Sequence, residues 1–518
     1  MFFFFFFIFP LKNRFEGRGL TVILFSVCPL LRFDTISTEV TEKEAFTKEV
    51  MGTRELEERV DDHVSISIVE KFANLSNPSS ECCIFRMYDH LRKENEKAYE
   101  PSIVAIGPYH HGKAHLQEME LHKLRYLRRF LSRRNETSVN RYVMAIRELE
   151  DRARKCYAEE TSILGLGVDS DQFVEMMLLD GFFIIELFRT YTMFIMLREN
   201  QQIFQSVQSV EELRDENYHI FQAFQIVQLL LAENDHIFKS DQILVAIRRD
   251  LILLENQLPF FILNRLFDMT NSDSNLGIIQ IALDFQKHLT QQNKLQAPSE
   301  ISIDNIKHLL DLLHNCWCSK LPETNRNVIM REKWEFINSA TELQEAGVQF
   351  KKAEGSNLFD IKFISGTLEI PLLSITDYTE SFFTNLVAFE LCPSYLKPKY
   401  VCDYIVFMDR LINSSKDVRL LNHSGIIESW VGDDAEVYSM LHKLFNITVT
   451  DPGFGYSEVF INVNNHCKQR RNVWMANLKR NYFNSPWALI SFLAATILLL
   501  LTVTQTIFSI LSFGKGSF

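Results

Sequence analysis

The chain lacks a cysteine framework. Its nine cysteines are an odd number scattered through 518 residues, and no CxxC pair has the spacing of a structural zinc site. Cys82 and Cys83 are adjacent, and Cys316 and Cys318 flank Trp317, but neither spacing matches a known ligand pattern. We therefore expect reduced thiols, and the sequence assigns no metal site and no cofactor.

Marked catalytic motifs are also missing. The sequence contains no P-loop, dinucleotide-binding GxGxxG, HExxH, GxSxG elbow or kinase signature. This removes the well-marked enzyme classes and leaves unmarked ones open. Gly165 and Gly167 stand outside a strand-turn-helix context, and the pair Asp169 and Asp171 is interpreted as a solvated loop.

An excess of positive charge is absent, since the net charge is -12 and the isoelectric point is near 5.7. An acidic surface repels a duplex, so we expect no nucleic-acid partner. One local basic face is predicted on a helix, opposite Met119, Leu124, Leu127 and Leu131. We interpret it as a solvated face, with contact to anionic lipid or an acidic partner as the alternative; its members are Lys123, Arg125, Arg128, Arg129, Arg133 and Arg134.

Charge is missing altogether from Asn484 to Gly514. The apolar stretch Trp487 to Phe513 exceeds the roughly 20 residues that cross about 30 Å of hydrocarbon. Its Leu, Ile, Phe and Val side chains outweigh the cost of Gln505 and a few hydroxyls. The sequence therefore predicts a single-pass membrane protein with its transmembrane helix at residues 487–513.

The charges that flank this stretch predict its orientation. Only Lys515 follows it, whereas five basic residues and no acidic one lie between Cys467 and Pro486, namely Lys468, Arg470, Arg471, Lys479 and Arg480. By the positive-inside rule the large domain lies in the cytosol, and the plasma membrane is one candidate location.

The first 50 residues contain two apolar stretches, MFFFFFFIFP and Leu20 to Leu31. Lys12, Arg14 and Arg18 precede the second stretch, so the segment could pass for a signal sequence. Against this, the basic region is not at the start of the chain and no small-residue cleavage site follows Leu31. We interpret residues 1–50 as an apolar or disordered leader, and an over-extended gene model is a hypothesis for its origin.

Helical periodicity dominates from about His115 to Leu313, so the expected fold class is mainly α. The runs 173–188 and 243–267 are apolar almost all round, which indicates burial in a large bundle. Residues 65–480 form the predicted domain, with a tentative sub-boundary at the polar stretch 288–300. A short β-hairpin is predicted near residues 358–375, turning at Ser365 and Gly366.

Two groups of residues could support chemistry. His111 and His115 are four apart and could share a metal on a helix, although Pro108 and Gly112 favour a turn at His110 and His111. The carboxylates inside apolar runs, Asp180, Asp250 and Glu255, are paired, capping or raised in pKa. Asn256 and Gln257 are expected to satisfy backbone groups that Pro259 frees.

Eight motifs stand in order along the chain, namely IFRM, AYEPSIVAIGPYHHG, MELHKLRYL, MMLLDGFF, DLILLENQLPFF, SATELQEAGVQF, NLVAFE and SPWALIS. By these motifs the chain resembles the plant domain-of-unknown-function 247 family over roughly Ser65 to Phe513. Two positions depart from the usual family pattern, since Tyr88 stands where a proline is usual and Phe182 where a cysteine is usual. No role is carried over to either position.

The resemblance implies a plant membrane protein with a helical body, a C-terminal span and no established catalytic residues. Some members are associated with self-incompatibility recognition in grasses. We therefore favour a membrane-anchored, non-enzymatic protein that acts in recognition or signalling through an unknown protein partner. The alternative is an unmarked hydrolase or transferase that uses Asp180, Asp250 or Glu255 with His110 or His111, which requires these groups to converge on a solvent-reachable cleft.

Overall fold

The computed structural model describes only part of the chain, and it separates Met1–Asn77 from Pro78–Phe518. The leader at residues 1–50 lies outside the described residues, as do Gly165, Gly167 and residues 291–300 of the expected boundary. The described residues are 64–65, 67–69, 81–93, 95–158, 168–199, 237–270, 277–290, 301–318, 334–354, 357–392, 395, 397–449, 453–469 and 486–515.

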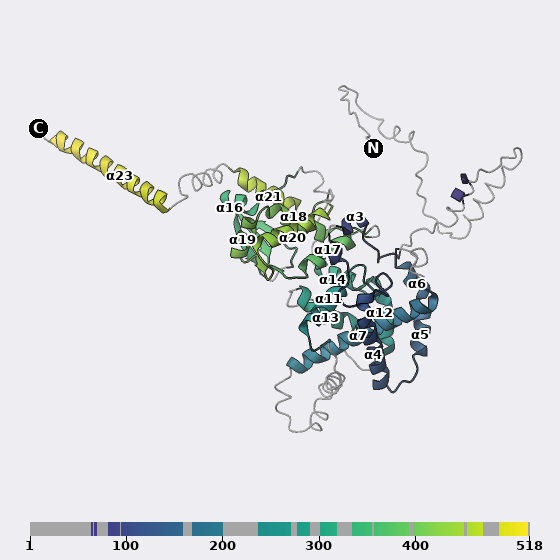
Figure 1. Cartoon of the computed structure of the whole chain (residues 1–518). Helices are drawn as coiled ribbons and strands as arrows, with labels where there is room; N and C mark the ends of the chain where they lie inside the picture. Colours follow the sequence, from purple (N-terminus) through teal and green to yellow (C-terminus); the bar gives the residue numbers. More distant parts are fainter. Residues whose placement is uncertain are drawn as a thin grey trace, which may run out of the picture. The chain divides into compact units, whose positions relative to one another are not determined.

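The mainly α fold class is confirmed (Figure 1). The described helices up to residue 318 are α3 (Asp89–Arg92), η2 (Glu96–Ala98), η3 (Ala114–Leu116), α4 (Gln117–Arg133), α5 (Asn140–Arg147), α6 (Glu150–Lys155), α7 (Ser170–Glu199), α11 (Asp241–Asp250), α12 (Phe260–Thr270), α13 (Ile278–Thr290), η4 (Ile303–Asn305) and α14 (Leu309–Cys318). The later ones are α16 (Ala340–Glu345), α17 (Thr379–Glu390), α18 (Tyr400–Leu411), α19 (Ser415–His423), α20 (Asp434–Asn446), α21 (Ser457–Lys468) and α23 (Pro486–Lys515).

Helix α7 is the centre of the first group of helices. It packs against α4, α5, α6, α12 and α13, and its run from Phe173 to Phe188 is buried almost all round, as predicted. Gly181 lets α12 approach closely, because an added Cβ would lie 2.5 Å from a methyl carbon of Leu266. Burial of each large apolar side chain here contributes about 1.5–3 kcal/mol.

The second apolar run, residues 243–267, forms two helices and not one. Helix α11 ends at Asp250 and α12 begins at Phe260, and Pro259, which lacks an N–H, directly precedes α12. The connecting residues 251–259 have no regular structure, yet all are buried. Their backbone groups therefore need partners from side chains.

The predicted hairpin is confirmed, and its surroundings are more complex than expected. Strands β2 (Lys362–Ile364) and β3 (Thr367–Pro371) pair antiparallel, and Ser365 and Gly366 in the turn both have positive φ angles, 51° and 86°. A third strand, β1 (Gln349–Ala353), pairs parallel with β3. The end of the predicted hairpin region forms β4 (Leu373–Ile375), which is not part of this sheet. It pairs with β5 (Ile427–Ser429) in a separate two-stranded sheet.

The later helices pack around α17, α18 and α20. Helix α14 contacts both α13 and α17. Of the polar stretch 288–300, residues 288–290 belong to α13, and the proposed sub-boundary there stays a prediction.

Helix α23 is long and apolar. Its segment Ile490–Ile510 is long and apolar enough to cross a membrane, and none of it is buried. Among the described residues it is the one such candidate. Its threonine hydroxyls donate to carbonyls one turn earlier, such as Thr496 to Phe492 at 2.8 Å and Thr502 to Leu498 at 2.7 Å. The helix thus satisfies these polar groups internally.

Candidate functional site

Several of the polar residues singled out in the sequence converge on a junction between two irregular segments, residues 99–113 and 251–259. Asp250 holds the first segment from the end of α11. Its carboxylate accepts hydrogen bonds from the backbone N–H groups of Ser102 at 3.0 Å, Ile103 at 2.7 Å and Val104 at 3.1 Å. Burial raises the pKa of Asp250, and these three donors oppose the rise.

Asn256 and Gln257 complete the connection, as predicted. The Asn256 amide accepts from Ile106 N at 2.7 Å and donates to Val104 O at 3.0 Å. Gln257 donates to Leu251 O at 2.7 Å and accepts from Leu310 N at 3.2 Å. These two amides therefore satisfy buried backbone N–H and C=O groups that lie outside regular helices and strands.

Asp180 holds the other end of the first segment. It accepts from Gly107 N at 2.8 Å and lies 2.5 Å from the Lys123 ammonium, which also donates to Ala105 O at 2.6 Å. Burial lowers the pKa of Lys123, but the carboxylates of Asp180 and Glu120 raise it above its usual value, so the lysine is a cation. Asp180 therefore acts as a paired structural carboxylate.

The basic-face prediction on α4 is wrong at Lys123. Lys123 is fully buried, whereas Leu124, expected on the apolar face, is 49% exposed. The reason is the buried carboxylate of Asp180, whose position no local pattern reveals. Arg133 and Arg134 are only partly covered and pair with acidic side chains, Glu186 and Glu136.

Gly107 is required by the geometry of the junction. Its φ angle is +71°, and an added Cβ would lie 2.7 Å from the Gln257 carbonyl oxygen. A side chain at this position would therefore clash with backbone in a conformation that L residues avoid. The close approach of the two segments depends on this glycine.

Histidine and carboxylate meet at one place in the junction. Nε2 of the fully buried His110 lies 3.7 Å from Glu255, and Nδ1 lies 3.5 Å from Glu100. Arg92 bridges Glu255 and Glu100. Burial lowers the pKa of His110 to about 3, so the imidazole is neutral near pH 7.

The enzymatic alternative is only partly met by this arrangement. Of the carboxylates proposed for it, Glu255 is the one that lies near a proposed histidine, at 3.7 Å from His110 Nε2. It also accepts a hydrogen bond from Met87 N at 3.0 Å. Both Glu255 and His110 are sealed from solvent, and their separation exceeds hydrogen-bond reach. Asp180 and Asp250 are bound to other partners.

The other sequence candidates lie apart. His111 is exposed, in the turn that the sequence favours. His115 belongs to the short helix η3, and its Nε2 lies 3.3 Å from the carbonyl oxygen of Pro101. Asp169 accepts from Gln172 N at 2.8 Å, and Asp171 pairs with Arg147. Both aspartates are exposed, as expected, but they lie at the start of α7 and not in a loop.

Sequence reasoning missed Asn385 in α17. Its amide accepts from Leu254 N at 2.8 Å and donates to Ala98 O at 2.8 Å. It therefore binds both irregular segments from a helix more than a hundred residues later. An amide inside the apolar run of α17 is a usable signal for such a role, but it does not name the partners.

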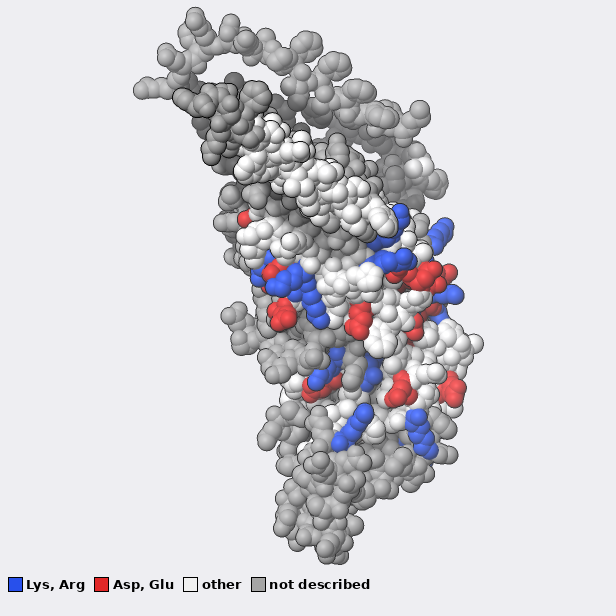
Figure 2. All heavy atoms as spheres, turned by 90° about the vertical axis from the view of Figure 1, so that its left-hand side faces the viewer, with Lys and Arg blue, Asp and Glu red and all other residues white. Residues whose placement is uncertain are grey.

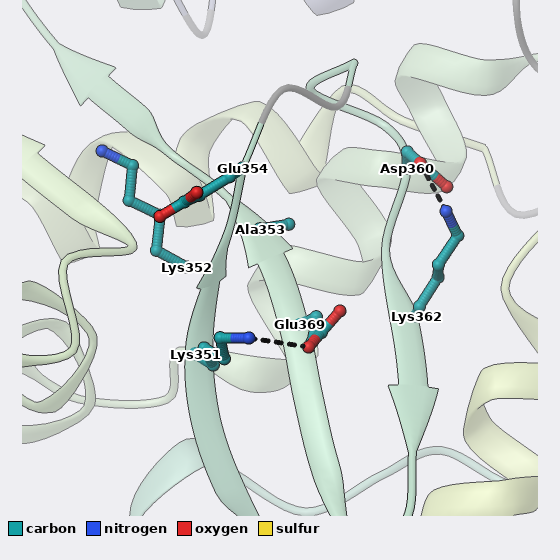
Figure 3. A pocket seen from close by; sticks show the side chains of 7 residues that line it. All are labelled: Lys351, Lys352, Ala353, Glu354, Asp360, Lys362 and Glu369. Carbon is teal, nitrogen blue, oxygen red and sulfur yellow. Dashed lines mark hydrogen bonds and ion pairs between the residues drawn. The ribbon is translucent and has the colours of Figure 1, made fainter.

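One charged hollow lies on the sheet, between strands β1, β3 and β2 (Figure 3). Its volume is about 240 Å³. Lys351 pairs with Glu369 at 3.4 Å, and Lys362 pairs with Asp360 at 2.7 Å. Because these lysines are largely exposed and already paired with acids, the hollow does not select a class of ligand.

Comparison with known proteins agrees with the resemblance seen in the motifs. The model of a family described as plant protein of unknown function, domain of unknown function 247, matches residues 84–501. The chain is 30% identical to the UPF0481 protein At3g47200 of Arabidopsis thaliana, over 83% of this chain and 87% of that protein. It is 24% identical to a second such Arabidopsis protein, At3g02645, over 82% and 89%. No solved structure matches the chain significantly.

Proposed function

The chain belongs to this plant family of unknown function, and on that premise we propose that it is a membrane-anchored interaction protein. Helix α23 is its anchor. The helical body lies on the cytosolic side, with the plasma membrane as the proposed location, and binds a protein partner.

The observation that carries this proposal is the exposed apolar surface of α23. Its 21 residues from Ile490 to Ile510 rise about 31 Å at 1.5 Å per residue, close to the hydrocarbon thickness of a bilayer. Leu498 and Leu499 are 64% and 66% exposed. Lipid would cover such side chains, and the internally bonded hydroxyls lower the cost of insertion.

The charge distribution supports the orientation and the class of partner. Five basic residues precede the helix and only Lys515 follows it. Acidic and basic side chains are interspersed over the face seen in Figure 2, and the net charge is -12. These features favour a cytosolic body and a protein partner over a nucleic acid.

The junction supports an interaction role over catalysis. Its carboxylates and amides are used to hold backbone, and its buried imidazole has no hydrogen-bonded carboxylate. Such a network fixes one conformation of irregular segments. We interpret it as the scaffold of a binding body.

The anchor is tested by extracting membranes that carry the full chain with alkaline carbonate. We expect the full chain to stay in the pellet and a chain that ends before Pro486 to be released. Release of both would contradict the anchor. Protease digestion of sealed vesicles with the cytosolic face outward tests orientation, and protection of the body would overturn it.

The interaction role is tested by crosslinking the anchored protein in its own membrane and identifying the captured chains. The released chain without α23 is the control for proximity to the membrane. A turnover activity abolished by Glu255→Gln, in a variant that still folds, would instead establish the enzymatic alternative.

A further inference from the structure

A second polar cluster lies away from the junction, where α14, α17 and α18 meet. We propose that His314, Cys318 and Glu390 form a buried site for a divalent transition cation of the zinc class. The site is independent of the membrane proposal, since none of the three residues belongs to α23.

The three donor atoms already converge. A ring nitrogen of His314, the Cys318 sulfur and a Glu390 carboxylate oxygen all lie within 4.8 Å of one another. His314 Nε2 contacts both other ligands, since it lies 2.8 Å from Glu390 Oε1 and 3.6 Å from Cys318 Sγ. The Tyr395 hydroxyl, at 3.4 Å from the same nitrogen, is a fourth polar group beside these three atoms.

Secondary structure explains why these side chains meet. His314 and Cys318 are four residues apart on α14, so they occupy neighbouring positions on one helix face. Glu390 is the last residue of α17, and α14 packs against α17. The sequence contains this HxxxC spacing, but Glu390 is brought to it only by the packing of the helices.

Two of the three ligands, Glu390 and His314, are held in place by their surroundings. The Glu390 carboxylate accepts from Val401 N at 3.0 Å and Cys402 N at 2.9 Å, in the first turn of α18. The His314 ring contacts Phe389 and Tyr395 edge to face. Such support around a metal site fixes the orientation of its ligands.

The donor set favours zinc over other common cations. One imidazole nitrogen, one thiolate and one carboxylate are ligands that Zn²⁺ accepts in tetrahedral geometry. Calcium and magnesium prefer oxygen ligands, and an iron–sulfur cluster needs more thiolates than one. Tyr395 or a water would occupy the fourth position.

Binding requires the three ligands to adjust locally, because the Glu390 oxygen and the Cys318 sulfur, which lie within 4.8 Å of each other, must also reach tetrahedral separation. Ligand atoms about 2.0–2.3 Å from a tetrahedral zinc lie roughly 3.3–3.6 Å apart, so the distance from His314 to Cys318 already suits it. Glu390 would move back from His314 by roughly 0.5 Å on the same estimate. Two protons are displaced as the metal enters. The Cys318 thiol loses its proton because the thiolate is the ligand, and the proton shared by His314 Nε2 and Glu390 leaves that position because a ring nitrogen that binds zinc carries no proton.

The cation would join three helices that are distant in sequence. His314 and Cys318 attach it to α14 and Glu390 attaches it to α17, while the same carboxylate holds the start of α18. All three ligands are buried, so the cation would be structural. Because a folded-state ligand adds to stability, its removal would lower the melting temperature.

The test is the zinc content of the full chain, purified in detergent and measured by inductively coupled plasma mass spectrometry. We expect about one zinc per chain in the wild type, as for a single structural site. Cys318→Ser should lose it. Cys316→Ser is the matched control, because Cys316 is a buried cysteine on the same helix and is not among the three ligands.

Cobalt substitution supplies a second readout that does not depend on the Cys318 variant folding. Cobalt-loaded wild type and Cys316→Ser should both show absorption from thiolate-to-cobalt charge transfer, and Cys318→Ser should not. A folded wild type that takes up neither zinc nor cobalt would overturn the proposal. Equal loss of metal from the Cys316 and Cys318 variants would overturn it as well.

Discussion

The Lys123 ammonium lies 2.5 Å from the Asp180 carboxylate, and together the two residues hold the backbone at the Ala105 carbonyl and the Gly107 N–H. Both side chains are fully buried. Helices α4 and α7 thus meet around a charge pair and not around apolar side chains alone. The rigidity of the junction depends on this pair being complete.

Removing one member of the pair should be strongly destabilising. Lys123→Met leaves the Asp180 carboxylate buried without its cation, which costs about 3–5 kcal/mol. We expect a large fall in the melting temperature of the full chain, followed by differential scanning fluorimetry. Lys416→Met makes the same change at an exposed position and should be near neutral; an equal fall in both variants would contradict the buried-pair account.

The pair also shows what the sequence could predict. The amphipathic period of α4 placed most arginines toward solvent, but the buried partner of Lys123 lies 57 residues later in an apolar helix. Periodicity reports the average polarity of a face and does not identify one buried cation that is neutralised from another element. Burial of Lys123 and exposure of Leu124 therefore required the tertiary structure.

The junction was predictable in kind and not in detail. Pro259 and the polar residues before it indicated freed backbone groups with side-chain partners, and Asn256 and Gln257 fill that role. The hairpin turn at Ser365 and Gly366 was likewise predictable from the local turn preferences of these residues. Asn385 and the parallel strand β1 were missed, because long-range pairing leaves little local signal.

Gly107 should tolerate alanine poorly. Its positive φ alone costs an L residue roughly 1–2 kcal/mol, and the clash with the Gln257 carbonyl adds to that cost. Gly112→Ala is the control, because Gly112 has φ +79° and an added Cβ there meets nothing within 4 Å. Thermal unfolding should show the larger loss at Gly107; equal losses would mean that the two segments do not approach so closely.

His110 should make stability depend on pH. Burial is the main cause that lowers the pKa of His110 in the folded state to about 3, below the unfolded value of about 6.5. Between these values the unfolded chain binds the extra proton, so stability falls as pH drops from about 6.5 toward 3, by up to about 1.4 kcal/mol per pH unit. His110→Gln should reduce this slope.

The measurement is the melting temperature from pH 7 to pH 4 for the wild type and His110→Gln. His111→Gln, a change at the exposed neighbour in the same turn, should keep the wild-type slope. A His110→Gln profile parallel to that of the wild type would show that other groups cause the acid sensitivity.

Asn385 should couple α17 to the junction. Asn385→Ala leaves Leu254 N and Ala98 O without their buried partner, and each unsatisfied group costs about 1–3 kcal/mol. Hydrogen exchange should accelerate at Leu254, while Asn422→Ala, at an exposed position, should leave it unchanged. Unaltered protection of Leu254 in Asn385→Ala would remove the proposed coupling.

The last prediction concerns α23 and separates a lipid-covered helix from one covered by protein. Leu499 is exposed near the middle of the apolar segment, where an arginine costs about 2.5–3.5 kcal/mol on an insertion scale. We expect Leu499→Arg to weaken retention in carbonate-washed membranes and Leu499→Ile to preserve it. If Leu499→Arg stays fully in the pellet after carbonate and leaves only on disruption of protein complexes, a protein groove and not the bilayer covers this helix, because a groove can supply an acidic or polar partner that hydrocarbon lacks.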